Sequence, residues 1–306
     1  MGVIADRILS ELGDPGLVEK LLALPKPDFH SLLLHVFREQ ANRAGPADVL
    51  KSFRTNRFSV PSEIDPVAYH RLESTFLSFA QNAGMEAVLL SPAAPFASSS
   101  AFGYVDQNNV VSAARGTEIL SDPTNMLAII IAGRLKNNHI ANREPVHLCT
   151  TARVLRAQVF PKGKGYYSHF GIFSIVSSGK DIGSYSCEKA LLGKHLAYYK
   201  KLLVEKHDAE LSIALRKRRG YSDGDGFYSS MAELVMAELP GVPLSLDSAY
   251  EENNYYQGLH FEIHMQKDNQ SMEIGDGGFV DWTQKMTGAR KERCLISGIG
   301  LDRLLI

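Results

Sequence analysis

The chain has 306 residues, 44% of them hydrophobic, and its 33 basic residues nearly balance 34 acidic ones, which gives a formal net charge of -1. This length is sufficient for one large domain or two small ones with a sizeable core. The balanced charge excludes a general electrostatic attraction of the whole protein to nucleic acid or to an anionic membrane.

Apolar runs and cysteines give expectations about the compartment. The longest apolar run, MLAIIIAG at 126–133, is far shorter than the roughly 20 residues that cross a bilayer. The sequence starts without a basic-then-apolar leader. Cys149, Cys187 and Cys294 are far apart and show neither a disulfide pattern nor zinc-ligand spacing. We therefore expect a reduced, cytoplasmic protein with no membrane segment.

Residues 1–57 predict an N-terminal helical extension. Turn signals interrupt its apolar periodicity at GDPG (13–16), LPKPD (24–28) and AGPAD (44–48). This spacing is typical of several helices with short connections. The remaining residues, 58–306, are expected to form one domain, and the sequence leaves open whether the extension binds a partner.

A longer helix is predicted over 66–82. Asp65 is a suitable N-cap, Pro66 is favourable in the first turn, and Gly84 lies just beyond the end. Leu72 and Phe76 fall on one apolar face of this helix.

Strand signals dominate the chain after this helix. They are β-branched or alternating runs separated by Gly, Pro, Asn and Lys. This order predicts an α+β domain with an antiparallel or mixed sheet flanked by helices. The runs are EAVLLS, NVVSAA, VHLCTT, ARVLRAQVF, HFGIFSIVSS, LSIALR, YYQGLHFEIHM and RCLISGI.

The hairpin ARVLRAQVF-PKGKG-YYSHFGIF carries the first functional signal. It brings together Arg156, Lys162, Lys164 and Tyr167. A guanidinium can fork onto phosphate oxygens, lysines supply point charge, and an aromatic ring can stack on a base. The alternative is an ordinary solvated loop.

Three segments in order resemble the catalytic core of class II aminoacyl-tRNA synthetases over about residues 58–306. AGMEAVLLSP resembles motif 1, with Pro92 as its proline; VLRAQVF…YYSHFGIF resembles motif 2; and ISGIGLDRLLI resembles motif 3. The resemblance is closest to histidyl-tRNA synthetase and its tRNA-free paralogues. It implies a class II synthetase-like antiparallel sheet flanked by helices.

The resemblance implies a site for ATP and Mg²⁺. Arg156 would hold the α-phosphate and Arg303 a terminal phosphate, and both would act in catalysis. Tyr167 would stack on adenine. The full set of expected ATP-binding residues is Arg156, Gln158, Lys162, Lys164, Tyr167, Gly298, Gly300 and Arg303.

The resemblance also implies a substrate pocket. Asp122, in ILSDPTN, would receive an ammonium group, and the segments NNYYQGLHFEIH and EIGDGGFVDW would form the pocket floor. His169 and Phe173 would face the substrate from the motif 2 return strand. The expected substrate-binding residues are Asp122, His169, Phe173, Tyr255, Tyr256, Gly277 and Gly278.

Three departures from the family pattern affect the expected substrate. Gln158 replaces a glutamate, and Phe173 replaces an acidic residue of the return strand. Glu251 and Glu252 stand where an arginine is expected, and they could instead recruit a magnesium ion. These changes argue against histidine recognition, and Phe173 favours a small or apolar amino acid.

Two functions follow from the resemblance. The first is an enzyme that activates an amino acid or related carboxylate with ATP, as an acyl-adenylate, for a non-tRNA acceptor such as a carrier protein. The second is an inactive paralogue that binds a small ligand and regulates an enzyme partner, as the synthetase-like regulatory subunit of ATP phosphoribosyltransferase does. Because the sequence stops at motif 3 without an anticodon-binding domain, we expect no tRNA charging. The motif 1 helix and strand predict a homodimer.

Each site residue also has a structural interpretation. Arg156 could be an ordinary strand-edge residue, Asp122 a helix N-cap and Arg303 a surface charge. Tyr167 and Tyr256 could be core aromatics, and His260 a strand residue. The run RKRR at 216–219 could contact nucleic acid, but it is more typical of a solvated turn.

Overall fold

An eight-stranded mixed sheet forms the centre of the protein in the computed structural model, which describes residues 2–137, 144–159, 167–206, 210–249, 255–267 and 270–306. β1 pairs with β5 and β7 pairs with β8 in parallel, and every other pairing in this sheet is antiparallel. The order is β1 (Glu86–Ala87), β5 (Val146–Leu155), β6 (His169–Lys180), β11 (Glu292–Gly300), β10 (Gln270–Val280), β9 (Gln257–Lys267), β7 (Leu211–Lys217) and β8 (Leu244–Asp247).

Helices cover both faces of this sheet, which confirms the predicted α+β class. The first face packs against α5, α7 and α8, and the aromatic rings of Phe76, Phe173 and Tyr198 meet there at centroid distances of 5.2 Å. The second face packs against α6 and α9 around the fully buried Trp282. The bounds are α5 (Pro66–Asn82), α6 (Pro123–Lys136), α7 (Ser186–Tyr199), α8 (Gly224–Glu238) and α9 (Trp282–Thr287).

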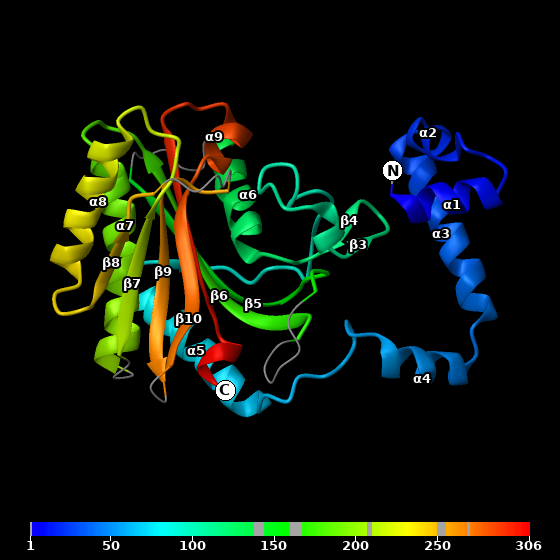
Figure 1. The fold of residues 1–306 in the computed structure, drawn as a ribbon, viewed down its shortest axis with the longest axis horizontal. Coiled ribbons are helices and arrows are strands. Elements are labelled where there is room, and N and C mark those ends of the chain that lie inside the picture. Colours follow the sequence, from blue (N-terminus) through cyan, green and yellow to red (C-terminus); the bar gives the residue numbers. More distant parts are fainter. Residues whose placement is uncertain (1, 138–143, 160–166, 207–209, 250–254, 268–269) are drawn as a thin grey trace.

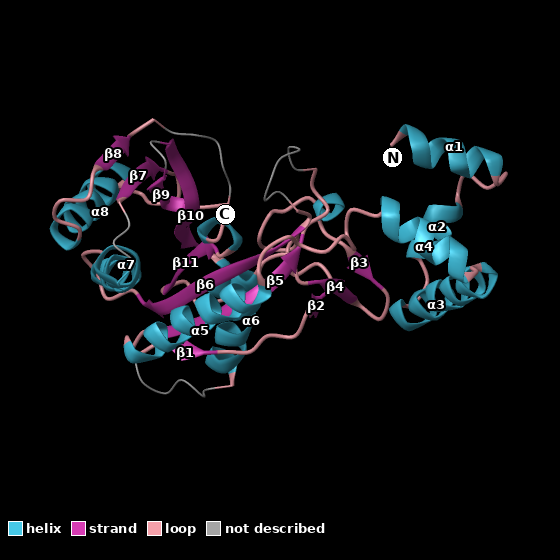
Figure 2. Cartoon of the chain, turned by 90° about the horizontal axis from the view of Figure 1, so that it is seen from below, coloured by secondary structure: helices cyan, strands magenta, loops and turns pink. Residues whose placement is uncertain are grey.

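A small sheet lies between the main sheet and the N-terminal helices (Figures 1 and 2). It consists of β2 (Ala93–Pro95), β4 (Thr117–Ile119) and β3 (Ser112–Ala113), with the 3-10 helix η1 (Gln107–Asn109) before β3. The buried Glu118 carboxylate orders the turn after β2, because it accepts hydrogen bonds from the Ala97 and Ser99 amides and from the Ser98 hydroxyl.

The N-terminal extension consists of α1 (Val3–Glu11), α2 (Leu17–Leu22), α3 (Lys26–Arg43) and α4 (Pro46–Thr55). The breaks fall at the three predicted turn signals. Figure 1 shows these helices standing beside the main body, joined to it through the segment at 56–65. Arg57 anchors that segment, because its guanidinium donates to the Gln158 carbonyl at 2.9 Å and to the Ser168 hydroxyl at 2.7 Å.

The helix at 66–82 matches its prediction. The Asp65 carboxylate accepts the Val67 amide at 3.0 Å, so the predicted cap is formed. The strand predictions were less accurate. VHLCTT and the start of ARVLRAQVF form the single strand β5, EAVLLS retains only the two residues of β1, and EIGDGGFV belongs to the long central strand β10.

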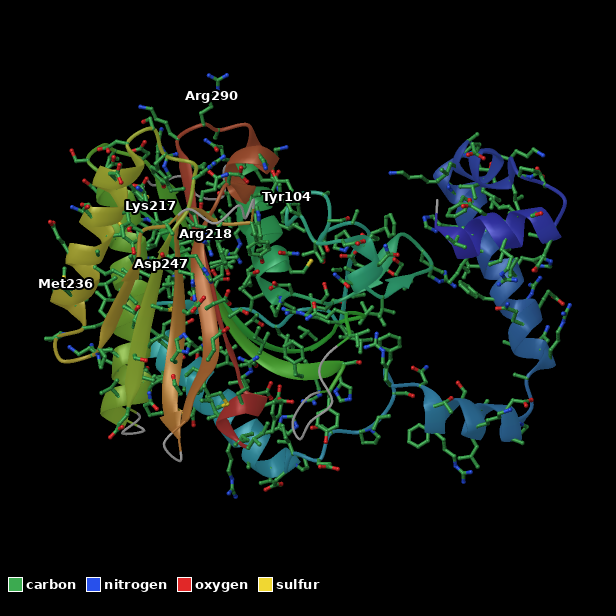
Figure 3. All side chains as sticks on the ribbon, viewed as in Figure 1. Tyr104, Lys217, Arg218, Met236, Asp247 and Arg290 are labelled. Atoms are coloured by element: carbon green, nitrogen blue, oxygen red, sulfur yellow. The ribbon has the colours of Figure 1, made fainter. Side chains whose placement is uncertain are left out.

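The prediction that RKRR forms a solvated turn is wrong for its first three residues. Arg216 lies within β7 and pairs with Glu262 at 2.6 Å and with Asp247 at 3.4 Å. Lys217 and Arg218 are buried, and the Lys217 ammonium contacts Asp225. Figure 3 labels both side chains within the main body. The first three residues are therefore held by the body of the protein, and only Arg219, which follows β7 in a bend, is exposed to solvent.

A buried chain of hydrogen bonds holds α7 against the sheet. The His195 imidazole bonds the hydroxyls of Ser177 on β6 and Ser297 on β11, both at 2.8 Å. Tyr199 bonds Ser297 at 2.7 Å, and His147 bonds Ser177 at 2.7 Å. Burial lowers the pKa of His195 well below its usual range and that of His147 to about 4. Both rings are therefore neutral near pH 7.

None of the described helices is long and apolar enough to span a membrane.

Candidate functional site

A cavity of about 340 Å³ opens on the sheet face that carries α6. Its floor is formed by β6, β9, β10 and β11, and its rim by the start of α6 and the end of β5. This volume is within the range of small-molecule sites. The lining residues are Val105, Asn109, Ser121, Asp122, Thr124, Arg156, Gln158, Ile172, Tyr255, Tyr256, His260, Asp276, Ile296, Ser297 and Gly298.

Asp122 has two structural roles at the rim. Its Oδ1 caps α6, because it accepts the Thr124 amide at 2.9 Å and the Thr124 hydroxyl at 2.7 Å. Its Oδ2 lies 3.4 Å from the Tyr255 hydroxyl and 3.8 Å from Nη2 of Arg156. The structural and functional interpretations of Asp122 are therefore compatible, since one oxygen caps the helix while the other faces polar groups of the cavity.

Arg156 is held just beyond the end of β5. Its backbone bridges to Val110, and its Nε donates to the Ser121 carbonyl at 3.0 Å. The guanidinium carbon lies 5.1 Å from the centre of the Phe170 ring. These contacts fix the side chain, which is 28% exposed, at the cavity wall. Such a guanidinium can bind a carboxylate or a phosphate.

Asp276 provides a second carboxylate, from the floor of the cavity. Its Oδ2 accepts the Tyr256 hydroxyl at 2.8 Å and lies 3.2 Å from Nε2 of His260. The buried Arg218 lies 3.1 Å from the other ring nitrogen, Nδ1. Because a guanidinium can only donate, Nδ1 is the acceptor and the ring proton resides on Nε2. His260 is thus a neutral donor to Asp276.

Two adjacent tyrosines connect the carboxylates. Tyr255 approaches Asp122 and Tyr256 approaches Asp276, and their rings meet edge to face at 4.8 Å. Burial raises the pKa of each phenol well above its usual value, and the neighbouring carboxylates raise it further. Both hydroxyls therefore remain protonated and act as donors.

Six of the residues predicted for the site line this cavity together. They come from the expected ATP-binding and substrate-binding groups, and they meet although they are distant in sequence. They are Asp122, Arg156, Gln158, Tyr255, Tyr256 and Gly298.

Phe173 does not contact the cavity. It is fully buried on the opposite face of the sheet, and its neighbour Ile172 lines the cavity instead. Successive residues of a strand point to opposite faces, so the prediction was displaced by one position. The expectation of an apolar substrate, which rested on Phe173, therefore loses its basis.

Other predicted residues lie near the cavity without lining it. Both ring nitrogens of His169 are already hydrogen-bonded, Nε2 with the Val60 carbonyl at 2.6 Å and Nδ1 with Nε of Arg153 at 2.8 Å. Tyr167 lies beside His169. Gly277 faces the opposite side of the sheet, where an added Cβ would lie 2.5 Å from the Phe261 ring. Gly278 lies beneath the Tyr256 ring.

The end of the chain also differs from the expected arrangement. β11 leads into the 3-10 helix η3 (Asp302–Leu304), as the strand-to-helix pattern predicts. The Arg303 guanidinium, however, donates to the Glu273 carbonyl, and neither Arg303 nor Gly300 lines the cavity.

Four predicted residues, Lys162, Lys164, Glu251 and Glu252, lie outside the described residues. Within the described part of the chain, no group of three or more His, Cys, Asp or Glu side chains could hold a metal ion.

Sequence reasoning missed Asp276 and assigned His260 no role in the site. The sequence did contain a signal, because Asp276 is flanked by Gly275 and Gly277 in EIGDGG. Glycine in a strand often marks the close approach of another group. An acidic residue flanked by glycines in such a strand could have been taken as a site residue.

No protein-family model and no curated protein sequence matches the chain. Solved structures do. An ATP phosphoribosyltransferase regulatory subunit/histidyl-tRNA synthetase from Bacillus halodurans has 13% identity and a TM-score of 0.60, and the match covers 81% of this chain and 82% of that one. Apo histidyl-tRNA synthetase from S. aureus has 13% identity and a TM-score of 0.58, with 80% and 71% covered. A histidine–tRNA ligase subunit from Alicyclobacillus acidocaldarius has 14% identity and a TM-score of 0.59, with 80% and 94% covered.

These similarities confirm the predicted scaffold. The chain has a class II synthetase-like fold, with its cavity on the sheet face that carries α6. One scaffold can support several activities, so the function has to be argued from the side chains of the cavity.

Proposed function

We propose that the cavity binds an α-amino acid or related carboxylate and activates it with ATP as an acyl-adenylate. The observation that supports this most directly is the position of Arg156 beside Asp122 at the cavity wall, 3.8 Å apart. An α-amino acid carries a carboxylate and an ammonium on one carbon. A guanidinium and a carboxylate side by side complement that pair of charges.

In the proposed reaction, a carboxylate oxygen of the substrate attacks the α-phosphorus of ATP and pyrophosphate leaves. Arg156 would stabilise the negative charge that builds on the phosphoryl oxygens, while Asp122 holds the ammonium in place. The Ser121 carbonyl orients the guanidinium before the substrates bind, because it accepts from Nε.

Magnesium is part of this proposal as a companion of ATP. In nucleotide sites it is commonly held by substrate phosphates with one or two carboxylates. Asp122 and Asp276 are the described carboxylates that line the cavity. Because Asp122 holds the substrate ammonium in this proposal, the phosphate chain would supply most of the magnesium ligands, and the ion would neutralise charge on the leaving pyrophosphate.

A regulatory, non-catalytic function is the second candidate. It is favoured by Arg303, which donates to the Glu273 carbonyl instead of facing the cavity. In this case the amino acid would be a regulatory ligand. The protein would regulate an enzyme partner instead of transferring an acyl group to an acceptor. The similar protein from Bacillus halodurans is described as an ATP phosphoribosyltransferase regulatory subunit/histidyl-tRNA synthetase, which is consistent with such a use of the scaffold.

The proposed function predicts amino acid-dependent exchange of pyrophosphate into ATP. We expect Asp122→Asn to reduce this exchange by about tenfold or more, because a charge-assisted contact to the ammonium is lost. Asparagine can still cap α6, so the variant should remain folded. Exchange would be measured over a panel of amino acids with magnesium, alongside calorimetry of amino acid binding. Binding without exchange would support regulation, and the absence of both would contradict the proposal.

We also propose a homodimer formed through α5 and β1. Leu89, which follows β1, is 96% exposed, and Val67 at the start of α5 is 54% exposed. Burying such side chains against a second copy is favourable. We expect light scattering at micromolar concentration to give the mass of two chains and Leu89→Glu to shift it toward one. A wild-type monomer under these conditions would contradict the prediction.

A further inference from the structure

Binding of the α-carboxylate and α-ammonium of an amino acid does not require the Asp276 carboxylate. Arg156 and Asp122 already match the carboxylate and ammonium that every α-amino acid carries. Asp276 comes from a different element, β10, and forms no ion pair with Arg156 within 4.0 Å among the described contacts. It lies beside Tyr256, whereas Asp122 lies beside Tyr255. The cavity therefore presents a second negative charge at a separate position.

Asp276 is also positioned for a ligand. Both of its described hydrogen bonds reach Oδ2, from Tyr256 and His260, and none of the described residues donates to Oδ1. The side chain is 45% exposed, while the two donors behind it are buried. The Asp276 carboxylate is thus held in place by two buried donors, while much of the side chain is exposed to solvent. A bound substrate would remove that water, which is costly for a charge unless the substrate supplies a donor or a cation.

We propose that Asp276 determines specificity by binding a second ammonium group, so that the amino acid is a diamino acid of the lysine and ornithine class. This inference rests on the proposed function, because it uses the same cavity and the same anchoring of the α-carbon.

The geometry favours an ammonium over a guanidinium. A guanidinium binds a carboxylate best through two parallel hydrogen bonds, one to each oxygen. Oδ2 of Asp276 already receives Tyr256 and His260, which leaves Oδ1 as the main acceptor. A compact ammonium needs only one such oxygen. Lysine should therefore bind more tightly than arginine.

The test compares lysine with norleucine, which has the same carbon chain without the terminal ammonium. Isothermal calorimetry on the full chain should give lysine an affinity about tenfold or more above that of norleucine. Asp276→Asn should lower the affinity for lysine to that for norleucine and leave norleucine within about twofold. Asp281→Asn is the matched control, because Asp281 accepts from Gln257 at 2.7 Å, pairs with Lys285 at 3.1 Å and does not line the cavity.

The outcomes separate this inference from the proposed function. Norleucine binding as tightly as lysine to the wild type would overturn the diamino acid assignment and leave amino acid binding intact. Equal weakening of both ligands by Asp276→Asn would also overturn it, because Asp276 would then hold the α-ammonium. Binding of no amino acid at all would overturn both proposals. The wild-type ratio of affinities decides the assignment even if thermal unfolding shows that the variant is misfolded.

Discussion

Gly278→Ala is expected to destabilise the protein and abolish ligand binding together. An added Cβ would lie 2.5 Å from Cδ1 of Tyr256 and 2.6 Å from the Leu259 carbonyl oxygen. The carbonyl belongs to β9, which pairs with β10, so it cannot move without opening the sheet. Tyr256 would have to rotate, and its hydrogen bond to Asp276 would be lost. We expect a loss of about 1–3 kcal/mol in the free energy of unfolding.

Urea unfolding and lysine calorimetry would measure the two effects of Gly278→Ala. Gly133→Ala is the matched control, because the same change in α6 places a Cβ with no atom outside the local helix within 4 Å. It should stabilise the helix by up to about 1 kcal/mol and leave binding unchanged. If the Gly278→Ala variant has the same free energy of unfolding and the same affinity for lysine as the wild type, the contact between Gly278 and Tyr256 does not shape the floor of the cavity.

Local signals predicted the helices well because their causes are local. Asp65 caps α5 through its own side chain, and the breaks between α1 and α4 fall at Pro and Gly residues, which disfavour the interior of a helix. The resemblance to the synthetase core likewise predicted Arg156, from motif 2, and Asp122, from ILSDPTN, and both line the cavity. Both residues lie at the ends of regular elements, where a motif fixes their position.

The errors arose where a residue's environment depends on distant chain. Phe173 and Ile172 are neighbours, and only the register of β6 with β5 and β11 decides which of them faces the cavity. Lys217 and Arg218 looked solvated because their partners, Asp225 and His260, come from α8 and β9. Asp276 was missed because its significance comes from two hydrogen-bond donors that are distant in sequence. They are Tyr256, which directly precedes β9, and His260 within β9.

Arg156→Ala should have the largest effect on activity. The guanidinium is anchored by Nε on the Ser121 carbonyl, which leaves its terminal nitrogens for a carboxylate or phosphate. Without it, Asp122 and Asp276 are the only charged side chains among the described residues that line the cavity, since His260 is a neutral donor to Asp276. They would repel an anionic group. We expect pyrophosphate exchange to fall by about 10²–10³-fold, as for the loss of one preorganised donor to transition-state charge.

Arg156→Lys should not restore exchange, and this variant makes the prediction specific. Lysine keeps the positive charge, but its single nitrogen cannot bond the Ser121 carbonyl and also fork onto a phosphate. Arg290→Ala is the control, because Arg290, labelled in Figure 3, lies on an exposed turn and does not line the cavity. Rates of exchange and calorimetry with lysine would be measured for all three variants. Full activity of Arg156→Lys would mean that charge alone suffices, and full activity of Arg156→Ala would remove the guanidinium from the mechanism. If the wild type binds lysine without exchange and Arg156→Ala loses that binding, the residue serves recognition alone, as the regulatory alternative requires.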